Sequence, residues 1–393
     1  MANNSIKPKN TCKNTDNASP SQKVSSVAGG NLVDKKIKAK PTVKLVLFLV
    51  LLLALIVSIP FSPFLEKVIN RADYTFLSNI GDYSVHFVDV GQGDCCIIEL
   101  PDNKVFMIDA GPESAKNNLS KYLDALRITT IDYLCFTHYD EDHIGNGVMI
   151  FDNYDVKNVF IPKVYSDYEV SQHKNINDYN VVSSPKWNKL SQVIYKEGCT
   201  ISYNSPDISI LSDNYNISFW MPLNDKESNS NNYSPFILVN LLGAKYMFTG
   251  DARSDKEEEF LSNYSTLIAS NPSFFDVDVF KLGHHGAASS NSANFLQVIK
   301  PEYAVASCGE YNKYGHPASE VLTTLQAVGC STIKQTSQDG SIVFAQADAT
   351  SPLQVKTGFN HIADFYLEWK YVVITGFIAL VIFGLTFIKK KKM

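Results

Sequence analysis

Short apolar runs alternate with polar turns over most of the chain, and this pattern predicts its secondary structure. Residues 83–90, 95–100 and 104–108 are apolar runs bounded by Gly, Pro, Asn and Asp, which is typical of strands joined by tight turns. Residues 114–126 instead place Leu and Tyr at helical spacing, and residues 131–136 form the next strand. Hairpin strands followed by strands that alternate with helices predict packed sheets with helices outside.

The segment from 151 to about 235 is less regular and rich in Asn, Ser, Tyr and Asp. We interpret it as scaffold strands with loops on the substrate side, with strands at 156–161 and 208–221 and a helix at 187–196. Beyond it, we expect strands at 235–242, 245–248, 277–282, 303–307 and around Ile333 and 342–344, and helices at 256–261, 294–299 and 320–328.

Two longer apolar runs flank this body and predict membrane helices. The run 45–65 follows a lysine-rich lead, and the run 369–388 begins at Trp369 and is followed by Lys389–Lys392. Each is about long enough to span a bilayer. Because lysines lie at both outer ends, the positive-inside rule places both termini in the cytoplasm and the body between the spans outside the cell membrane. The alternative for the first run is a cleaved signal peptide, but no cleavage motif of small residues follows it.

These boundaries divide the chain into six predicted parts. They are a disordered basic cytoplasmic tail (1–44), a transmembrane helix (45–65), a hydrolase-like domain (82–346), a linker (347–368), a second transmembrane helix (369–388) and a cytoplasmic basic tail (389–393).

Composition limits the function in two ways. The net charge of -5 argues against a broad basic face for nucleic acid, although a local basic groove remains compatible with it. The seven cysteines include no C-x-x-C pair, so a zinc ribbon has no support.

The stretch 137–147, which follows the strand at 131–136, carries the strongest chemical signal. His138, Asp140, Asp142 and His143 fall within six residues of one another. Histidine and carboxylate ligands together suit Zn, Mn or Fe. The alternative is a polar turn between a strand and a helix, because Asp is common in turns.

Four further strand ends also carry Asp or His. Asp109, Asp251, the pair His284–His285 and His316 each follow an apolar strand. Taken singly, Asp251 is explained as a helix cap and a histidine as a loop residue. Together they favour a common site, because strand ends of such a sheet converge at one edge.

At this point the motifs resemble a known family. H-x-D-x-D-H, Thr249-Gly250-Asp251 and a late His are similar to the metallo-β-lactamase superfamily of binuclear metal hydrolases. The segments 89–94, 283–286 and 314–317 resemble the extracellular hydrolase domain of ComEC-type competence DNA-uptake proteins, over roughly residues 82–346. The resemblance implies an α+β fold, an αββα four-layer sandwich (metallo-β-lactamase fold), here flanked by one transmembrane helix at each end.

The resemblance also implies two divalent metal ions, Zn or Mn, and a ligand set. His138 and Asp140 would bind the first metal, Asp142 and His143 the second, with Asp251 bridging, a histidine of the 284–285 pair completing the first site and His316 the second. His285 is favoured over His284. Asp142 and Asp251 would be catalytic, Asp142 by orienting a bridging hydroxide, while Asp109 would orient the cluster and Asp94 and Gln92 would lie on a loop over the site.

The sequence departs from the superfamily in two places. Asp140 stands where most members have His, as it does in the ComEC type, and no histidine lies between His173 and His284, so the usual ligand before Asp251 is missing. The His284–His285 pair is the candidate substitute. The many-helix channel of an uptake protein is also missing, so we do not expect this chain to form a DNA pore itself.

We therefore expect a membrane-anchored phosphodiesterase or nuclease that uses a metal-bridging hydroxide as nucleophile. Its partners would be the lipid bilayer and DNA or another phosphodiester. Arg253, Lys281 and Lys313 lie near the motifs but form no basic run, which weighs against DNA. Two alternatives stay open: a hydrolase of another ester (a cell-wall phosphodiester, a lactone or a thioester), and a non-catalytic, anchored interaction module with a structural metal.

Overall fold

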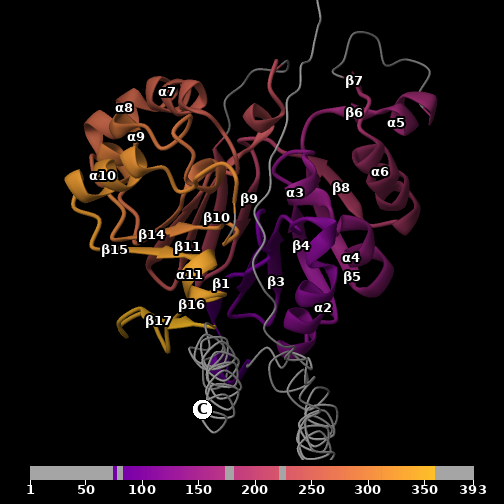
Figure 1. Ribbon diagram of the computed structural model, residues 1–393, viewed down its shortest axis with the longest axis horizontal. Helices are drawn as coiled ribbons and strands as arrows, with labels where there is room; N and C mark the ends of the chain where they lie inside the picture. Colours follow the sequence, from indigo (N-terminus) through magenta and orange to yellow (C-terminus); the bar gives the residue numbers. More distant parts are fainter. Residues whose placement is uncertain (1–73, 78–82, 173–180, 221–226, 311, 359–393) are drawn as a thin grey trace, which may run out of the picture. The chain divides into compact units, whose positions relative to one another are not determined.

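Two β-sheets form the centre of the protein (Figure 1). The structure is a computed structural model, and it describes residues 74–77, 83–172, 181–220, 227–310 and 312–358. The predicted membrane spans at 45–65 and 369–388 and both predicted tails lie outside these residues. Within the ranges described, no helix is long and apolar enough to cross a membrane.

The first sheet combines the early hairpin strands with the strands around the His138 motif. Its order is β17-β16-β1-β2-β3-β4-β5-β8, with β1 Ser84–Phe87, β2 Cys96–Glu99, β3 Val105–Ile108, β4 Thr130–Cys135, β5 Asp155–Ile161, β8 Thr200–Tyr203, β16 Ile342–Ala345 and β17 Gln354–Thr357. The strands from β3 to β8 are parallel, and the other pairs are antiparallel. The carboxyl ends of β3 and β4 therefore lie side by side.

The second sheet is built in a similar way. Its order is β15-β14-β13-β12-β11-β10-β9, with β9 Ser209–Leu211, β10 Tyr215–Trp220, β11 Phe236–Leu241, β12 Ala244–Phe248, β13 Val279–Lys281, β14 Tyr303–Ala306 and β15 Thr332–Gln335. The strands from β12 to β15 are parallel. Their carboxyl ends share one edge, which places the segments after β12 and β13 next to each other.

The alternation of side chains along each strand assigns one face of each sheet to a shared core. On β1, Val85 and Phe87 enter this core, whereas His86 points to the other face and its Nδ1 lies 2.9 Å from the Tyr122 hydroxyl. The Phe87 ring stacks on Phe248 of β12 at 5.8 Å, so the two sheets are in contact through buried aromatic side chains.

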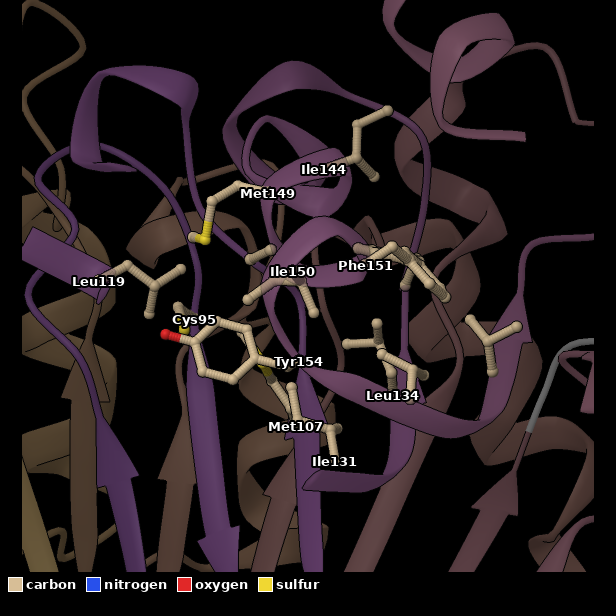
Figure 2. Close-up of a cluster of buried hydrophobic side chains, with 14 of the residues drawn as sticks. Cys95, Met107, Leu119, Ile131, Leu134, Ile144, Met149, Ile150, Phe151 and Tyr154 are labelled. Atoms are coloured by element: carbon tan, nitrogen blue, oxygen red, sulfur yellow. The ribbon is translucent and has the colours of Figure 1, made fainter. Parts of the chain in front are cut away.

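Helices cover both outer faces (Figure 1). The first sheet packs against α2 Lys116–Ala125, α4 Gly147–Asn153 and α6 Pro185–Glu197, and the second against α7 Ser254–Asn263, α9 Ala293–Ile299 and α10 Ser319–Ala327, with α8 Ser265–Ser270 beside them. Figure 2 shows Leu119, Met149 and Ile150 of the helices against Ile131 and Leu134 of β4. The order helix, sheet, sheet, helix confirms the αββα sandwich, a metallo-β-lactamase fold.

The remaining elements are short. They are the 3-10 turns η1 Tyr74–Leu77, η2 Glu113–Ala115, η3 Ser230–Tyr233 and η4 Gly283–Gly286, the helices α3 Glu141–Ile144, α5 Asp167–Gln172 and α11 Thr336–Asp339, and the strands β6 Tyr165–Ser166 and β7 Val181–Val182.

Several elements differ from the sequence prediction. The strand expected over 208–221 is a hairpin, β9 and β10, because the chain turns where the Ser212 amide donates to the Tyr215 carbonyl. Strand β17 lies inside the predicted linker 347–368 and pairs with β16. Its polar sequence, Gln-Val-Lys-Thr, carries no hydrophobic signal because it is an edge strand. The helix α8 was not predicted either: it has only six residues, and its Leu267 and Ile268 are only partly buried against the core.

Truncating Phe248 tests the contact between the sheets. The side chain is 2% exposed and is stacked on Phe87. We expect Phe248→Ala to lower the free energy of unfolding by about 3–5 kcal/mol, because it removes buried apolar surface and leaves a cavity. The measurement is urea denaturation followed by circular dichroism. Leu211→Ala is the matched control: Leu211 is 70% exposed and its truncation should change stability by about 0.5 kcal/mol or less.

Candidate metal centre

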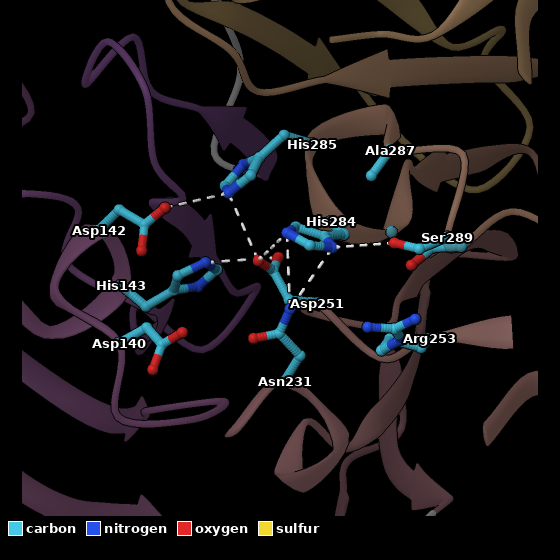
Figure 3. A network of polar contacts seen from close by, with 12 residues as sticks. Asp140, Asp142, His143, Asn231, Asp251, Arg253, His284, His285, Ala287 and Ser289 are labelled. Carbon is cyan, nitrogen blue, oxygen red and sulfur yellow. Dashed lines mark hydrogen bonds and ion pairs between the residues drawn. The ribbon is translucent and has the colours of Figure 1, made fainter. Parts of the chain in front are cut away.

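The polar residues singled out in the sequence follow parallel strands of both sheets. Asp109 comes directly after β3, and the His138 motif comes after β4. Asp251 follows β12, and His284 with His285 follows β13. The structure brings these four strand ends together (Figure 3), so the cluster takes one half from each sheet.

Asp109 organises the half that comes from the first sheet. Its buried carboxylate accepts the Thr137 amide at 2.8 Å and the Thr137 hydroxyl at 2.7 Å. It also lies 2.8 Å from Nδ1 of His143. A carboxylate only accepts, so Nδ1 carries the hydrogen and Nε2 of His143 points away, to 3.3 Å from Oδ1 of Asp251. Asp109 thus fixes the orientation of the His143 ring.

Asp251 lies between imidazoles on two sides (Figure 3). Its Oδ1 faces His143, while its Oδ2 lies 3.6 Å from Nε2 of His284 and 3.5 Å from Nε2 of His285. The carboxylate is buried, which by itself raises its pKa, but the charges of His285 and His143 hold the pKa well below the usual range. Its backbone amide donates to the hydroxyl of Ser234. The two oxygens therefore face different groups of ligand atoms.

His285 is held from behind by two acceptors. Its Nδ1 lies 2.9 Å from the Ser307 carbonyl and 3.1 Å from Oδ1 of Asp94. Its Nε2 then faces the cluster, 3.3 Å from Oδ2 of Asp142. Burial lowers the pKa of His285, but Asp251 and Asp94 outweigh it and raise the pKa to about 10. The surrounding carboxylates therefore make this site favourable for positive charge.

Asp94 is fixed in turn by a buried lysine. The Lys281 ammonium lies 2.5 Å from Oδ2 of Asp94 and donates to the Leu282 carbonyl. Asp94 is 6% exposed and Lys281 is 4% exposed. The sequence placed Asp94 on a loop over the site, but its carboxylate is buried against Lys281 and His285. Lys281 is therefore not available to a substrate.

The glycine of the Gln92-Gly93-Asp94 turn is required by close packing. Gly93 has φ +154°, and a Cβ there would lie 2.4 Å from the Asp142 carbonyl oxygen. The Asp94 amide donates to the same carbonyl. The Gln92 side chain accepts the Gly309 amide at 3.2 Å and so ties this turn to the segment before His316.

His138 and Asp140 complete the part of the cluster nearest the surface. His138 Nε2 is 3.7 Å from Oδ2 of Asp140, and the His138 and His143 rings are 4.1 Å apart. His138 is fully buried, whereas the Asp140 side chain is 39% exposed and accepts the Ser230 hydroxyl. The cluster is therefore accessible from solvent on this side.

His284 and His316 lie at the margin. The His284 side chain is 27% exposed, and Asn231 and Ser289 lie 3.4 Å from its Nδ1. The His316 ring is 5.7 Å from His284 and 6.3 Å from His285. Burial, followed by the charge of His285, lowers the pKa of His316 to about 4.

The donor atoms of the cluster fit a metal ion. His138 Nε2, His143 Nε2, His285 Nε2 and Asp251 Oδ1 are buried and have no hydrogen-bond partner among the described residues. Buried polar atoms normally find a partner, and these atoms point at one another. Imidazole nitrogens and carboxylate oxygens are ligands of Zn, Mn and Fe.

The structure groups the candidate ligand atoms in another way than the resemblance implied, and the ligand assignments stay predictions. The atoms of His138, His143 and Asp251 lie within 4.8 Å of one another, as do those of Asp142, His143 and His285. His285 thus lies beside Asp142 and not with His138 and Asp140, because Asp94 and Ser307 hold its ring. His316 joins neither of these groups, although its Nδ1 is buried without a partner.

Several neighbours of the cluster were missed in the sequence. They are Thr137, Ser230, Asn231, Ser234, Ser307 and the ion-pairing role of Lys281. Short polar residues are so common that their spacing carries no signal. Only Thr137 could have been suggested by the sequence, because it is adjacent to the motif residue His138.

Part of the chain matches a known superfamily. Residues 88–189 match the family model of the metallo-beta-lactamase superfamily. ComE operon protein 3 of Bacillus subtilis is 28% identical over 289 residues, covering 69% of this chain and 34% of that protein. Competence protein ComA of Neisseria gonorrhoeae is 26% identical over 263 residues, covering 65% and 31%. The chain thus spans about a third of the length of these curated relatives.

Two solved structures match the chain at low sequence identity. A metallo hydrolase from the archaeon Ignicoccus hospitalis has 15% identity and a TM-score of 0.41, covering 67% of this chain and 99% of that one. The metallo-beta-lactamase fold protein YhfI of Bacillus subtilis has 10% identity and a TM-score of 0.38, covering 64% and 96%.

Asp109→Asn tests whether Asp109 positions a metal ligand. Asparagine tolerates the φ of +58° and can still accept the Thr137 amide, but it removes the charged acceptor behind His143. We expect metal affinity to fall about 10- to 100-fold, as measured by competition with a chromophoric chelator.

Asp132→Asn is the control, because Asp132 accepts the Val105 amide at the opposite end of β3. Unchanged metal affinity in Asp109→Asn would show that Asp109 has no positioning role.

Proposed function

We propose that the chain carries a domain of the metallo-beta-lactamase superfamily, related to competence proteins, and that this domain is a metal-dependent phosphodiesterase with a two-metal centre. The observation that carries the proposal is the position of Asp251. Its Oδ1 faces Nε2 of His143 and its Oδ2 faces Nε2 of His285, and both nitrogens are buried without a hydrogen-bond partner among the described residues. A single carboxylate in that position can bind two cations at once.

The geometry favours a particular division of the ligands. His138 and His143 would share one cation with Oδ1 of Asp251, and Asp142 and His285 would share the other with Oδ2. Asp140 and His284, both partly exposed, would lie at the open margin of the two sets. A pair of divalent cations, Zn or Mn, would activate water near neutral pH and stabilise negative charge on the substrate.

The residues around the centre suit an anionic ester. Asp140 and Asp142 have side chains that are 39% and 34% exposed, so a substrate can reach the cluster. Among the three cationic residues near the motifs, Lys281 is buried, whereas Arg253 and Lys313 are exposed. Figure 3 shows Arg253 on the same side as His284 and Ser289. The relation to competence proteins supports a phosphodiester, and nucleic acid in particular, as the substrate.

Hydrolysis of bis-p-nitrophenyl phosphate tests this function. We expect turnover by the purified chain with Mn or Zn, loss of turnover with a chelator and recovery on readdition of metal. Asp251→Asn should lower the rate at least about 100-fold, because only a carboxylate offers two anionic oxygens.

Asp278→Asn is the matched control, since Asp278 accepts the Lys245 amide at the far end of β12 and should leave the rate unchanged. Metal binding without turnover of this ester, of single- or double-stranded DNA, or of lactones and thioesters would favour the interaction module instead. Turnover of a lactone or thioester alone would replace the phosphodiester with another ester.

We also propose that the two apolar runs anchor the domain on the outer side of the cell membrane, with both termini in the cytoplasm. Fluorescent reporters that mature only in the cytoplasm, fused to either end, should both be bright. A reporter that is active only outside the cytoplasm, inserted between the runs, should also be active. An extracellular signal from either terminus would contradict this topology.

A further inference from the structure

Three aromatic rings form a column from the metal centre to the surface. The His285 and His316 rings lie at an interplanar angle of 22° with centroids 6.3 Å apart. The His316 and Tyr314 rings also lie at 22°, with centroids 5.6 Å apart. Tyr314 is the outermost ring, so the column leads from a buried ligand of the cluster to an exposed phenol.

Tyr314 is exposed to an unusual degree for a tyrosine. It is 60% exposed, and the other exposed large hydrophobic residues in the described ranges, Val181 and Leu211, lie on the strands β7 and β9. Neighbouring Lys313 is also exposed, and its ammonium lies over the Tyr314 ring, 5.1 Å from the ring centre, so a stacking base would displace it toward the backbone phosphate. An aromatic face and a cation are thus presented together beside the site.

The segment that carries this ring is held by hydrogen bonds at both ends. The Asn312 side chain donates to the Gly309 and His316 carbonyls and accepts the His316 amide. The Gly309 amide donates to Gln92, which anchors the segment to the turn before Asp94. Tyr314 therefore lies between two hydrogen-bonded positions of this segment, Asn312 and His316.

We propose that Tyr314 is a stacking platform for one base of a single-stranded nucleic acid, with Lys313 binding a phosphate of the same strand. This subsite deepens the proposed function and rests on it. A flat ring beside a cation matches an unpaired base and its backbone, since every base offers a π-face and each nucleotide carries one anionic phosphate. Bases inside a duplex have both faces covered by their neighbours, so the platform selects single strands.

Binding by the full chain of two fluorescent oligomers tests the platform. One is a phosphorothioate oligothymidylate, and the other is an abasic strand of the same length and linkage. Tyr314→Ala should weaken binding of the thymidylate about tenfold or more and leave binding of the abasic strand within about twofold. Tyr314→Phe should retain wild-type affinity, because the ring is kept.

Lys313→Ala should weaken binding of both strands alike and reduce the salt dependence of binding by about one phosphate contact. Leu211→Ala and Lys196→Ala are the controls, since they remove an exposed apolar side chain and an exposed lysine away from the motifs. Equal weakening of both strands by Tyr314→Ala would overturn the proposal, because the ring would then contact sugar or phosphate. No weakening of either strand, or equal affinity for a duplex, would also overturn it.

The outcomes separate this inference from the proposed function. Base-dependent binding by a chain that does not hydrolyse bis-p-nitrophenyl phosphate would support the platform and refute the hydrolase. Hydrolysis by a chain whose nucleic-acid binding does not depend on the bases would support the hydrolase and refute the platform.

Discussion

Burial of the Asp251 carboxylate between imidazoles from both sheets is the interaction on which the rest of the site depends. A carboxylate that is 3% exposed has lost its hydration and needs opposite charge or donors around it. His143 and His285 supply this at Oδ1 and Oδ2 respectively, and each is oriented by a further acceptor, Asp109 or Asp94. The two halves are therefore held in register by the same charges that would bind metal.

The backbone around the Asp251 cluster is strained at several residues. Asp109, His284 and His285 all have φ between +50° and +58°, a region that non-glycine residues rarely adopt. Gly250, next to Asp251, has φ +49°, and a Cβ there would lie 2.7 Å from the Ser234 hydroxyl oxygen. Such conformations persist only where the surrounding packing determines them, and they are concentrated at functional sites. The sheet cores, with Phe87 and Phe248 directly beneath, provide that packing.

The sequence predicted the features that depend on local pattern. Apolar runs identified most strands, and the closely spaced His138–His143 motif identified one half of the cluster. It could not predict contacts set by tertiary structure. Nothing in the spacing pairs Asp94 with Lys281, so the lysine was noted only as a cation near the motifs and the carboxylate was placed on a loop over the site. The grouping of His285 with Asp142 has the same origin, because it follows from where Asp94 and Ser307 hold the ring.

The acidic composition has to be weighed together with the ions that the cluster would hold. A net charge of -5 counts the carboxylates around the cluster, Asp109, Asp140, Asp142 and Asp251, as free anions, whereas two divalent cations would offset their charge. The local field at the site would then be much less negative than the net charge of the chain suggests, which removes the repulsion of a phosphate group there. A substrate that contacts the protein at a few points does not need a basic groove, because the metal ions would supply the positive charge and few cationic side chains would be required around them. The net charge therefore argues against broad duplex binding but not against a short, single-stranded phosphodiester at this centre.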